Sequence, residues 1–335
     1  MTNALARCAV TVAVLLPVAA FAEPIKLKMA YFSSDQEPPY VSLMEPFAEA
    51  VNRDAGGILE IVPYPGGVLG RNYSQQVQQV LDGVADMAWI NPNLTPERFP
   101  DNEALEFPGL FRDLREASLV FSRLVAAGRL RGYEDFFVIA AGANHSLIIN
   151  TRPPVEQLSD LRGKTLRVNN QIEGSALKSV GIKPVVVAVN EAALAISRGT
   201  LDGAVVSPNA LFAYGVSRIT RFHYDVPLGA APLAFLMNRQ KFESLPKAGQ
   251  DVIRKYSGEK ATEQFIATYD ASNTQVMNDL KADPNRHVIE PTPADLDVLH
   301  TVFKSGIERW RNEDPRNPQL WNAVKAEIAK LRSGD

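Results

Sequence analysis

Residues 83–93 read GVADMAWINPN, and residues 199–209 read GTLDGAVVSPN. Both fit the pattern G-x-x-D-x-A-x-x-x-P-N, and we call each copy a repeated segment. Each copy follows a stretch with the apolar spacing of a helix, and it predicts a turn, a short strand and a polar loop. One copy in each half of the chain predicts two similar α/β lobes.

The loops at the ends of the repeated segments are candidates for a binding cleft. In open α/β sheets, ligands bind beyond the carboxyl ends of the strands, where loops of two lobes can face each other. Asn91, Ser207 and Asn209 lie in these loops, although asparagine is also a common turn former. The sequence therefore predicts a two-lobed protein that closes around a small molecule.

Composition and charge narrow the class of protein. The chain has 335 residues, of which 46% are hydrophobic and 22% charged, as expected for a soluble globular protein with two domains. The net charge is −3 and no basic stripe occurs, which argues against a nucleic-acid partner. Neither half contains the glycine-rich turn that holds phosphates, so no nucleotide cofactor is expected.

The first 22 residues have the features of a secretory signal peptide. Arg7 is the only charged residue before Glu23, an apolar run covers residues 9–21, and AFA at 20–22 fits the small-x-small cleavage rule. A membrane anchor is the alternative, but the run is too short to span a bilayer. We predict cleavage after residue 22, loss of the single cysteine, Cys8, and a periplasmic mature chain without disulfides.

The expected elements form two βαβαβ runs. The strands are predicted at 26–32, 59–62, 86–90, 165–168, 184–189 and 203–206. The helices are predicted at 42–53, 73–81, 172–180 and 191–197. A helix at 114–127 and strands at 136–140 and 147–149 join the runs, and a strand at 233–238 follows them.

The last third of the chain is mainly helical. A proline-free stretch at 247–281 is long enough to reach across both lobes as one helix. A further helix is expected after Thr292, a plausible cap, and another at 319–331. We predict a signal peptide at 1–22, lobe I from 23–146 plus 234–280, and lobe II from 147–233 plus 281–335.

Arg167 is the sharpest candidate for contact with a ligand. It lies late in the predicted strand 165–168. On an edge strand an arginine is usually solvated, whereas in a cleft its planar guanidinium holds a carboxylate through two parallel hydrogen bonds. The residue pattern leaves both interpretations open. Asn170 could add a neutral donor, and Tyr31 and Trp89 could line the same cleft, with core packing as the alternative for Trp89.

No residue pattern indicates catalysis or a metal site. The four histidines are dispersed, and none is spaced i, i+4 from another. His223 is interpreted as a packed strand or hinge residue, because no triad partner can be named. Asp86 and Asp202, the acids of the repeated segments, are interpreted as turn residues that bond to the local backbone, with a catalytic pair as the alternative.

Several blocks of this sequence resemble the extracytoplasmic solute receptors of TRAP transporters, the DctP-type family. The blocks are DLRGKTLRV at 160–168, GTLDG at 199–203, GGILEIVPYPGGVLG at 56–70 and FPGLF at 107–111. The resemblance covers essentially the whole mature chain. It implies a two-lobed periplasmic-binding-protein fold, similar to type II, in which each lobe is a mixed sheet flanked by helices and a long helix spans both lobes.

The resemblance also implies a function. Members of this family bind an organic acid and deliver it to the membrane permease subunits of a TRAP transporter; a monomer is the default, without a cofactor. Their arginine that pairs with the ligand carboxylate corresponds to Arg167, and further contacts correspond to Asn170 and Asn91. The sequence departs from the family pattern at two places. No second arginine occurs near Asn144, and Val189 replaces an aromatic residue that stacks on the ligand in some relatives. A doubly anionic ligand is therefore not supported.

Two other functions remain open. The same two-lobed scaffold serves receptors of ABC importers and of sensor kinases, which differ only in the membrane partner. A secreted enzyme is the third possibility, and the lack of a nucleophile, base and orienting residue argues against it. The ligand stays open among hydroxy acids, keto acids, uronates, dicarboxylates and aromatic acids.

Overall fold

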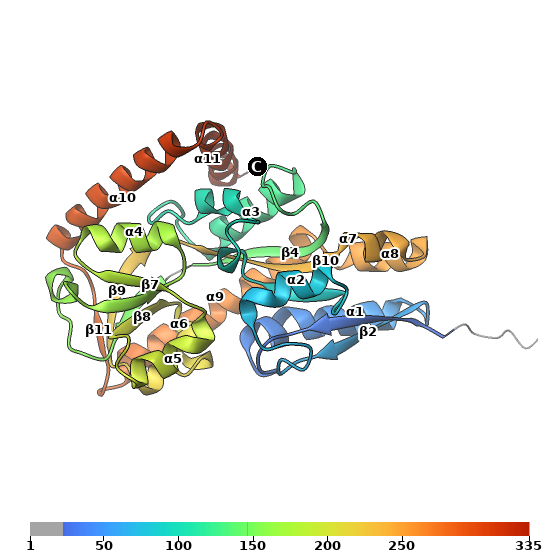
Figure 1. Ribbon diagram of the computed structural model, residues 1–335, viewed down its shortest axis with the longest axis horizontal. Coiled ribbons are helices and arrows are strands. Elements are labelled where there is room, and N and C mark those ends of the chain that lie inside the picture. Colours follow the sequence, from blue (N-terminus) through green and yellow to red (C-terminus); the bar gives the residue numbers. More distant parts are fainter. Residues whose placement is uncertain (1–22, 146, 335) are drawn as a thin grey trace, which may run out of the picture.

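Two mixed β-sheets lie end to end and form the frame of the molecule (Figure 1). The computed structural model describes residues 23–145 and 147–334. The predicted signal peptide at 1–22 and Cys8 lie outside the described residues. Within the described ranges, no helix combines the length and the apolar character needed to cross a membrane.

The elements have the following bounds. The first sheet contains β1 (Ile25–Ala30), β2 (Leu59–Tyr64), β3 (Met87–Ile90), β4 (Phe136–Asn144) and β10 (Ala231–Asn238). The second contains β5 (Leu147–Thr151), β6 (Thr165–Val168), β7 (Lys183–Val186), β8 (Gly203–Val206), β9 (Phe222–Leu228) and β11 (His287–Ile289). The helices are α1 (Glu45–Asp54), α2 (Gln76–Leu81), α3 (Leu114–Ala126), α4 (Gln171–Ser179), α5 (Val189–Ser197), α6 (Pro208–Ala213), α7 (Arg239–Ser244), α8 (Lys247–Lys255), α9 (Glu259–Ala282), α10 (Pro293–Glu313) and α11 (Asn317–Ser333).

The repeated segments occupy the same place in the two sheets. Strand order is β2-β1-β3-β10-β4 in the first sheet and β11-β9-β5-β8-β6-β7 in the second. β3 pairs parallel with β1 and antiparallel with β10, just as β8 pairs parallel with β6 and antiparallel with β5. The prediction of two similar α/β lobes with mixed sheets is therefore confirmed.

The two aspartates of the repeated segments make the same backbone contacts. The carboxylate of Asp86 accepts a hydrogen bond from the backbone N–H of Lys28 at 2.7 Å, and that of Asp202 accepts one from Thr165 at 2.7 Å. The backbone N–H of each aspartate donates in return to the carbonyl of the same partner. Both acids are structural, as interpreted, but each one joins a neighbouring strand rather than its own turn.

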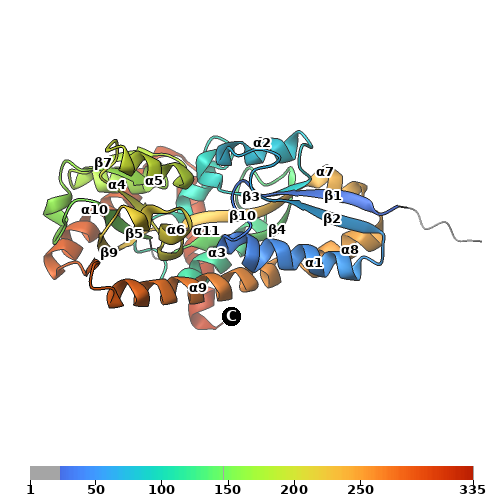
Figure 2. The same ribbon diagram turned by 90° about the horizontal axis from the view of Figure 1, so that it is seen from below.

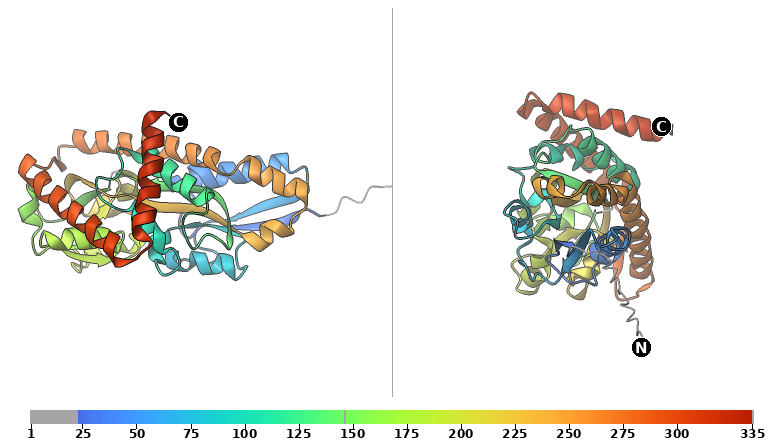
Figure 3. Two further views of the ribbon diagram at one scale, coloured as in Figure 1. Left: turned by 90° about the horizontal axis from the view of Figure 1, so that it is seen from above. Right: turned by 90° about the vertical axis from the view of Figure 1, so that its right-hand side faces the viewer.

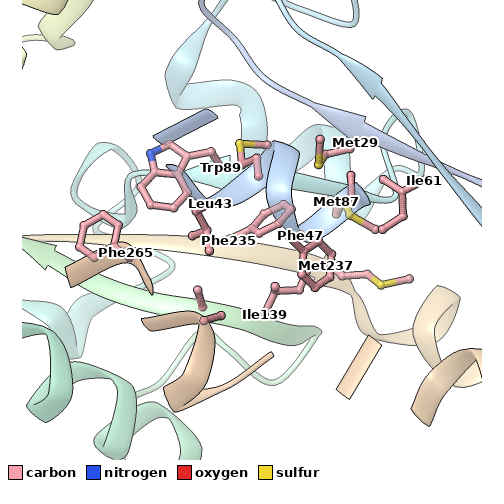
Figure 4. Close-up of a cluster of buried hydrophobic side chains, with 14 of the residues drawn as sticks. Met29, Leu43, Phe47, Ile61, Met87, Trp89, Ile139, Phe235, Met237 and Phe265 are labelled. Atoms are coloured by element: carbon pink, nitrogen blue, oxygen red, sulfur yellow. The ribbon is translucent and has the colours of Figure 1, made fainter. Parts of the chain in front are cut away.

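Apolar clusters cover the faces of the first sheet. Leu27 and Met29 point into one cluster and Ala30 into another, as the period-2 alternation of a strand requires. Figure 4 shows the first of these clusters, in which the ring of Trp89 lies 5.8 Å from that of Phe265, centroid to centroid. Because Phe265 belongs to α9, this contact fixes that helix to the core of the first lobe.

The stretch predicted as one helix at 247–281 consists of α8 and α9. Gly258 lies between them with φ at +76°, a left-handed conformation that a residue with a side chain adopts only at a cost. The long helix therefore begins at Glu259 rather than at Lys247. Its span across both lobes is confirmed, because α9 contacts β4 in the first lobe and α6 and β11 in the second, as Figure 2 shows.

The chain crosses between the lobes after β4 and again after β9. At the second crossing, a Cβ atom on Gly229 would lie 1.8 Å from the carbonyl oxygen of Glu106, so only glycine fits this close approach. The returning strand β10 already begins at Ala231, before the predicted 233. β7 also differs from its prediction, because it ends at Val186 and Val189 starts α5.

The C-terminal helices cover both lobes. α10 packs on α4 of the second lobe, whereas α11 packs on α3 and on the 3-10 segment Pro100–Leu105 of the first. Figure 3 shows α10 running across the second lobe and α11 turning over the first. The segment from residue 281 to residue 334, predicted as part of lobe II, therefore packs partly on lobe I.

Candidate functional site

A cavity with about 560 Å³ of empty space, including its opening to solvent, lies between the lobes. It sits beyond the carboxyl ends of β3 and β8, as the rule for open α/β sheets predicts. Arg167 is the only charged residue among the described residues of its wall. The wall is formed by Pro38, Pro39, Tyr73, Trp89, Asn91, Asn144, Leu147, Arg167, Asn169, Val189, Val206, Ser207, Asn209, Ala210, Ala213, Tyr214, Ala231, Leu233 and Tyr269.

Three hydrogen bonds fix the guanidinium of Arg167, whose exposure is only 1%. Its Nε donates to the carbonyl of Val187 at 3.0 Å. Its Nη1 donates to Asn169 Oδ1 at 2.6 Å and to the carbonyl of Val205 at 2.8 Å. Nη2 has no hydrogen-bond partner within the described part of the chain. The group is held rigidly on one edge and keeps donor capacity on the other.

The positive charge of Arg167 has no direct counter-charge in the described residues, because no carboxylate lies within ion-pair distance. Burial lowers the pKa of Arg167 to about 10, so the group stays protonated at neutral pH. Removing one partner of a buried charge pair costs about 3–5 kcal/mol, because it leaves the other charge uncompensated. An anion bound beside Arg167 would supply the missing counter-charge and so remove the free-energy cost of an uncompensated buried charge.

Glu173 compensates the charge of Arg167 only partly, because it is linked to Arg167 through the side chain of Asn169. Its Oε2 accepts hydrogen bonds from the backbone N–H of Asn169 at 2.8 Å and from Asn169 Nδ2 at 2.9 Å. Burial raises the pKa of Glu173 to about 7, so near neutral pH the carboxyl group is only partly ionised. Asn169 thus stands between the two charged groups and orients its oxygen toward Arg167.

Aromatic rings from both lobes form much of the remaining wall. They belong to Tyr73, Trp89, Tyr214 and Tyr269. Burial raises the pKa of Tyr73, Tyr214 and Tyr269, so their hydroxyl groups stay neutral. The cavity therefore offers one cation among aromatic rings and neutral polar side chains.

The structure brings most of the predicted site residues together. Those that line the cavity are Arg167, Asn91, Trp89, Ser207 and Asn209. Asn170 does not; its side chain caps α4 by accepting from the backbone N–H of Glu173 at 2.7 Å, and it lines a neighbouring cavity together with Asn93. Tyr31 lies behind the wall, where its hydroxyl donates to Glu37 at 2.8 Å.

Glu37 lies beside the cavity. Its carboxylate accepts from the hydroxyl groups of Tyr31 at 2.8 Å and Ser33 at 2.5 Å, both in the first lobe. Burial raises the pKa of its carboxyl group. Because Pro38 and Pro39 follow directly and line the cavity, these contacts fix the first-lobe edge of the cavity.

Sequence reasoning missed several wall residues. Tyr73, Tyr214 and Tyr269 come from three distant segments, and no sequence pattern links them. Asn169 had a detectable signal, because it directly follows the strand that carries Arg167. Asn144 entered only as the place where a second arginine is missing, yet its side chain is part of the wall.

The interpretation of His223 as a packed residue agrees with the structure. His223 is fully buried, and its Nδ1 lies 2.6 Å from Asn150 Oδ1. Burial lowers the pKa of His223 to about 4, so it is a neutral packed residue. In residues 23–145 and 147–334, no group of three or more histidine, cysteine, aspartate or glutamate side chains is suited to hold a metal ion.

Comparison with known proteins identifies the class. The chain belongs to the DctP family, the bacterial extracellular solute-binding proteins of family 7, whose model matches residues 29–313. The family prediction is confirmed. A solute-binding protein of Verminephrobacter eiseniae is 23% identical, with 80% of this chain and 84% of the relative covered. The C4-dicarboxylate-binding periplasmic protein DctP of Rhodobacter capsulatus is 22% identical, with 71% of this chain and 72% of the relative covered.

A solved structure matches over nearly the whole chain. It is a TRAP solute-binding protein from a marine metagenome, specific for aromatic acid ligands and bound to 3-hydroxybenzoate. The TM-score is 0.84 at 25% sequence identity, and the match covers 92% of this chain and 99% of that one. The two-lobed fold of this protein is therefore that of the TRAP solute receptors.

Proposed function

We propose that this protein is a periplasmic TRAP-type receptor whose ligand is a monocarboxylate with a ring-shaped, apolar body. The observation that carries the proposal is the guanidinium of Arg167, which is buried, charged and unpaired at the wall of a cavity between two lobes. A carboxylate would accept from its free edge. Asn91 and Ser207 would add polar contacts, and the cavity would close around the bound acid.

The wall favours one carboxylate over two. A dicarboxylate would place its second anionic group among apolar and neutral side chains, where an unpaired charge costs several kcal/mol. The rings of Trp89 and Tyr269 favour an aromatic body, because offset or edge contacts between rings add about 0.5–1.5 kcal/mol to the burial of apolar area. The aromatic acid specificity of the marine relative, at 25% identity, supports the same choice.

Ligand binding would be coupled to closure. The cation comes from the second lobe, whereas Trp89 and Tyr73 come from the first, so only closed lobes contact the ligand from both sides. A ligand shifts an equilibrium toward the state that it contacts better. We propose that the crossings after β4 and β9 act as hinges, while α9 bends or pivots along both lobes.

The binding test compares acids and variants. The mature protein, freed of copurified ligand by unfolding and refolding, is titrated calorimetrically with benzoate and with succinate. We expect benzoate to bind and succinate to bind at least tenfold more weakly. Arg167→Met should weaken benzoate binding by about 2–5 kcal/mol, as for a buried charge pair that loses one member. Arg162→Met, at an exposed arginine of the preceding turn, is the matched control and should keep wild-type affinity.

Incubating the protein with its ligand distinguishes a receptor from an enzyme. Ligand recovered unchanged after long incubation supports a receptor, whereas a modified product would contradict it. Delivery to a TRAP permease is tested by uptake of labelled acid into cells that carry the permease, with and without the receptor. Sedimentation of the purified protein checks the expected monomer.

A further inference from the structure

Three side chains beside Arg167 form a hydrogen-bonded relay that joins the lobes. Asn144, at the end of β4, donates from Nδ2 to Ser207 Oγ at 2.8 Å. Ser207 Oγ donates in turn to Asn209 Oδ1 at 2.7 Å. All three residues line the cavity. The relay runs from the first lobe to the second, so both amides have orientations set by the hydroxyl group between them.

The two ends of the relay are buried and have no hydrogen-bond partner in residues 23–145 and 147–334. They are Asn144 Oδ1, an acceptor, and Asn209 Nδ2, a donor. Reversing the direction of the whole relay would exchange the two ends and would again leave one acceptor and one donor, because a hydroxyl group accepts and donates once within it. A buried polar group without a partner is unfavourable, because the hydrogen bonds that it made to water are lost and not replaced. Both residues line the cavity, so this donor and acceptor are candidates for contact with a ligand group.

We infer that the ligand is a hydroxyl-bearing aromatic monocarboxylate whose hydroxyl group donates to one end of this relay and accepts from the other. The inference rests on the proposed function, because Arg167 must hold the carboxylate for the rest of the molecule to reach the relay. A hydroxyl group is the smallest substituent that both donates and accepts. Methyl or halogen substituents would leave both amide ends unpaired, and a ketone or ether would leave one.

The neighbouring cavity offers a natural control. Asn93 is the counterpart of Asn209 in the first repeated segment, and its amide is also buried without a partner. It lines the neighbouring cavity, which contains Asn170 and not Arg167. A substitution at Asn93 therefore removes a similar buried amide away from the proposed ligand.

The experiment uses pairs of acids that differ only in hydroxyl against methyl. These are the three hydroxybenzoates against the three methylbenzoates, and mandelate against 2-phenylpropanoate. We expect wild type to prefer the hydroxyl member of at least one pair by about 10- to 100-fold in Kd, as a lost buried partner predicts. Asn209→Leu should reduce that preference below about threefold while the methyl acid still binds, and Asn93→Leu should keep it.

Each outcome decides the matter. If no acid of either kind binds, the proposed function itself fails. If both members of every pair bind wild type equally well, the monocarboxylate function stands and the hydroxyl inference is overturned. The inference is also overturned if Asn209→Leu, like Asn93→Leu, retains the wild-type preference for the hydroxyl acid over the methyl acid. Because the wild-type comparison needs no variant, poor folding of a variant does not block the test.

Discussion

The two repeated segments show how one backbone pattern supports two different tasks. The register pairs Ala30 with Ala88 in the first lobe and Arg167 with Ala204 in the second, so Ala30 and Arg167 occupy equivalent positions. In the first lobe a methyl group at that position packs into the core. In the second a guanidinium reaches the cavity. The shared frame places a side chain, and the identity of the side chain decides the chemistry.

The loops after the two strands differ in a similar way. In the first lobe, Asn91 Oδ1 accepts from the backbone N–H of Asn93 at 3.0 Å, which closes the loop on itself. In the second, Ser207 occupies the position of Asn91 and accepts a hydrogen bond from Asn144 of the first lobe. The first lobe therefore contributes mainly walls, and the second contributes the charge and most of the polar contacts.

The largest expected effect separates binding from stability at Arg167. Arg167→Met should abolish most ligand affinity, by about 2–5 kcal/mol, yet raise the unfolding free energy of the unliganded protein or leave it unchanged. The reason is that the variant removes a buried charge without a counter-charge. Urea unfolding of ligand-free protein measures the second quantity. A clear loss of stability would mean that Asn169 and Glu173 already compensate the charge.

A somewhat smaller effect concerns the pH dependence that Glu173 adds to the second lobe. Its pKa is raised from 4.5 to about 7 in the folded state, so its contribution to stability is complete below pH 4.5 and is lost as pH rises through 7. That change amounts to roughly 3 kcal/mol. Glu173→Gln should therefore gain stability relative to wild type between pH 4.5 and 8, as urea unfolding at both pH values would show. A constant difference would contradict this.

Because Asp86 and Asp202 make equivalent hydrogen bonds to the backbone, we expect replacing either one to reduce stability by a similar amount. Asp86→Ala and Asp202→Ala each remove a charged acceptor from a backbone N–H, which is worth about 1.5–3 kcal/mol. Thermal and urea unfolding should give similar losses for the two variants. A much larger loss of unfolding free energy for one variant would show that the two equivalent contacts contribute unequally to stability.

The smallest expected effect is at Asn170, which the resemblance predicted as a ligand contact. As the cap of α4, Asn170→Ala should lower the unfolding free energy by about 1 kcal/mol. Benzoate affinity should stay within about twofold of wild type, since the side chain does not line the cavity. A tenfold weaker affinity would instead place Asn170 against the ligand in the bound state.

Much of the frame could be predicted because local patterns set it. Gly and Asp at fixed positions identified both turns, and the apolar runs that follow could only be buried strands. Arg167 was recognisable because a charged residue between two apolar ones, late in a strand, must either face solvent or serve a site. The break between α8 and α9 at Gly258 could not be predicted. The conformation of this glycine depends on where the folded chain must turn, and no neighbouring residue indicates that position.

The sequence by itself determined two α/β lobes, the approximate positions of most strands and helices, and one candidate arginine late in a strand, because these follow from periodicity, turn chemistry and the repeated segments. Only the tertiary structure decided which side chains surround that arginine. Tyr73, Tyr214 and Tyr269 meet because three distant elements pack together, and Asn144 reaches Ser207 because the lobes close on each other. Contacts between residues far apart in the chain arise from packing, and local sequence does not encode them.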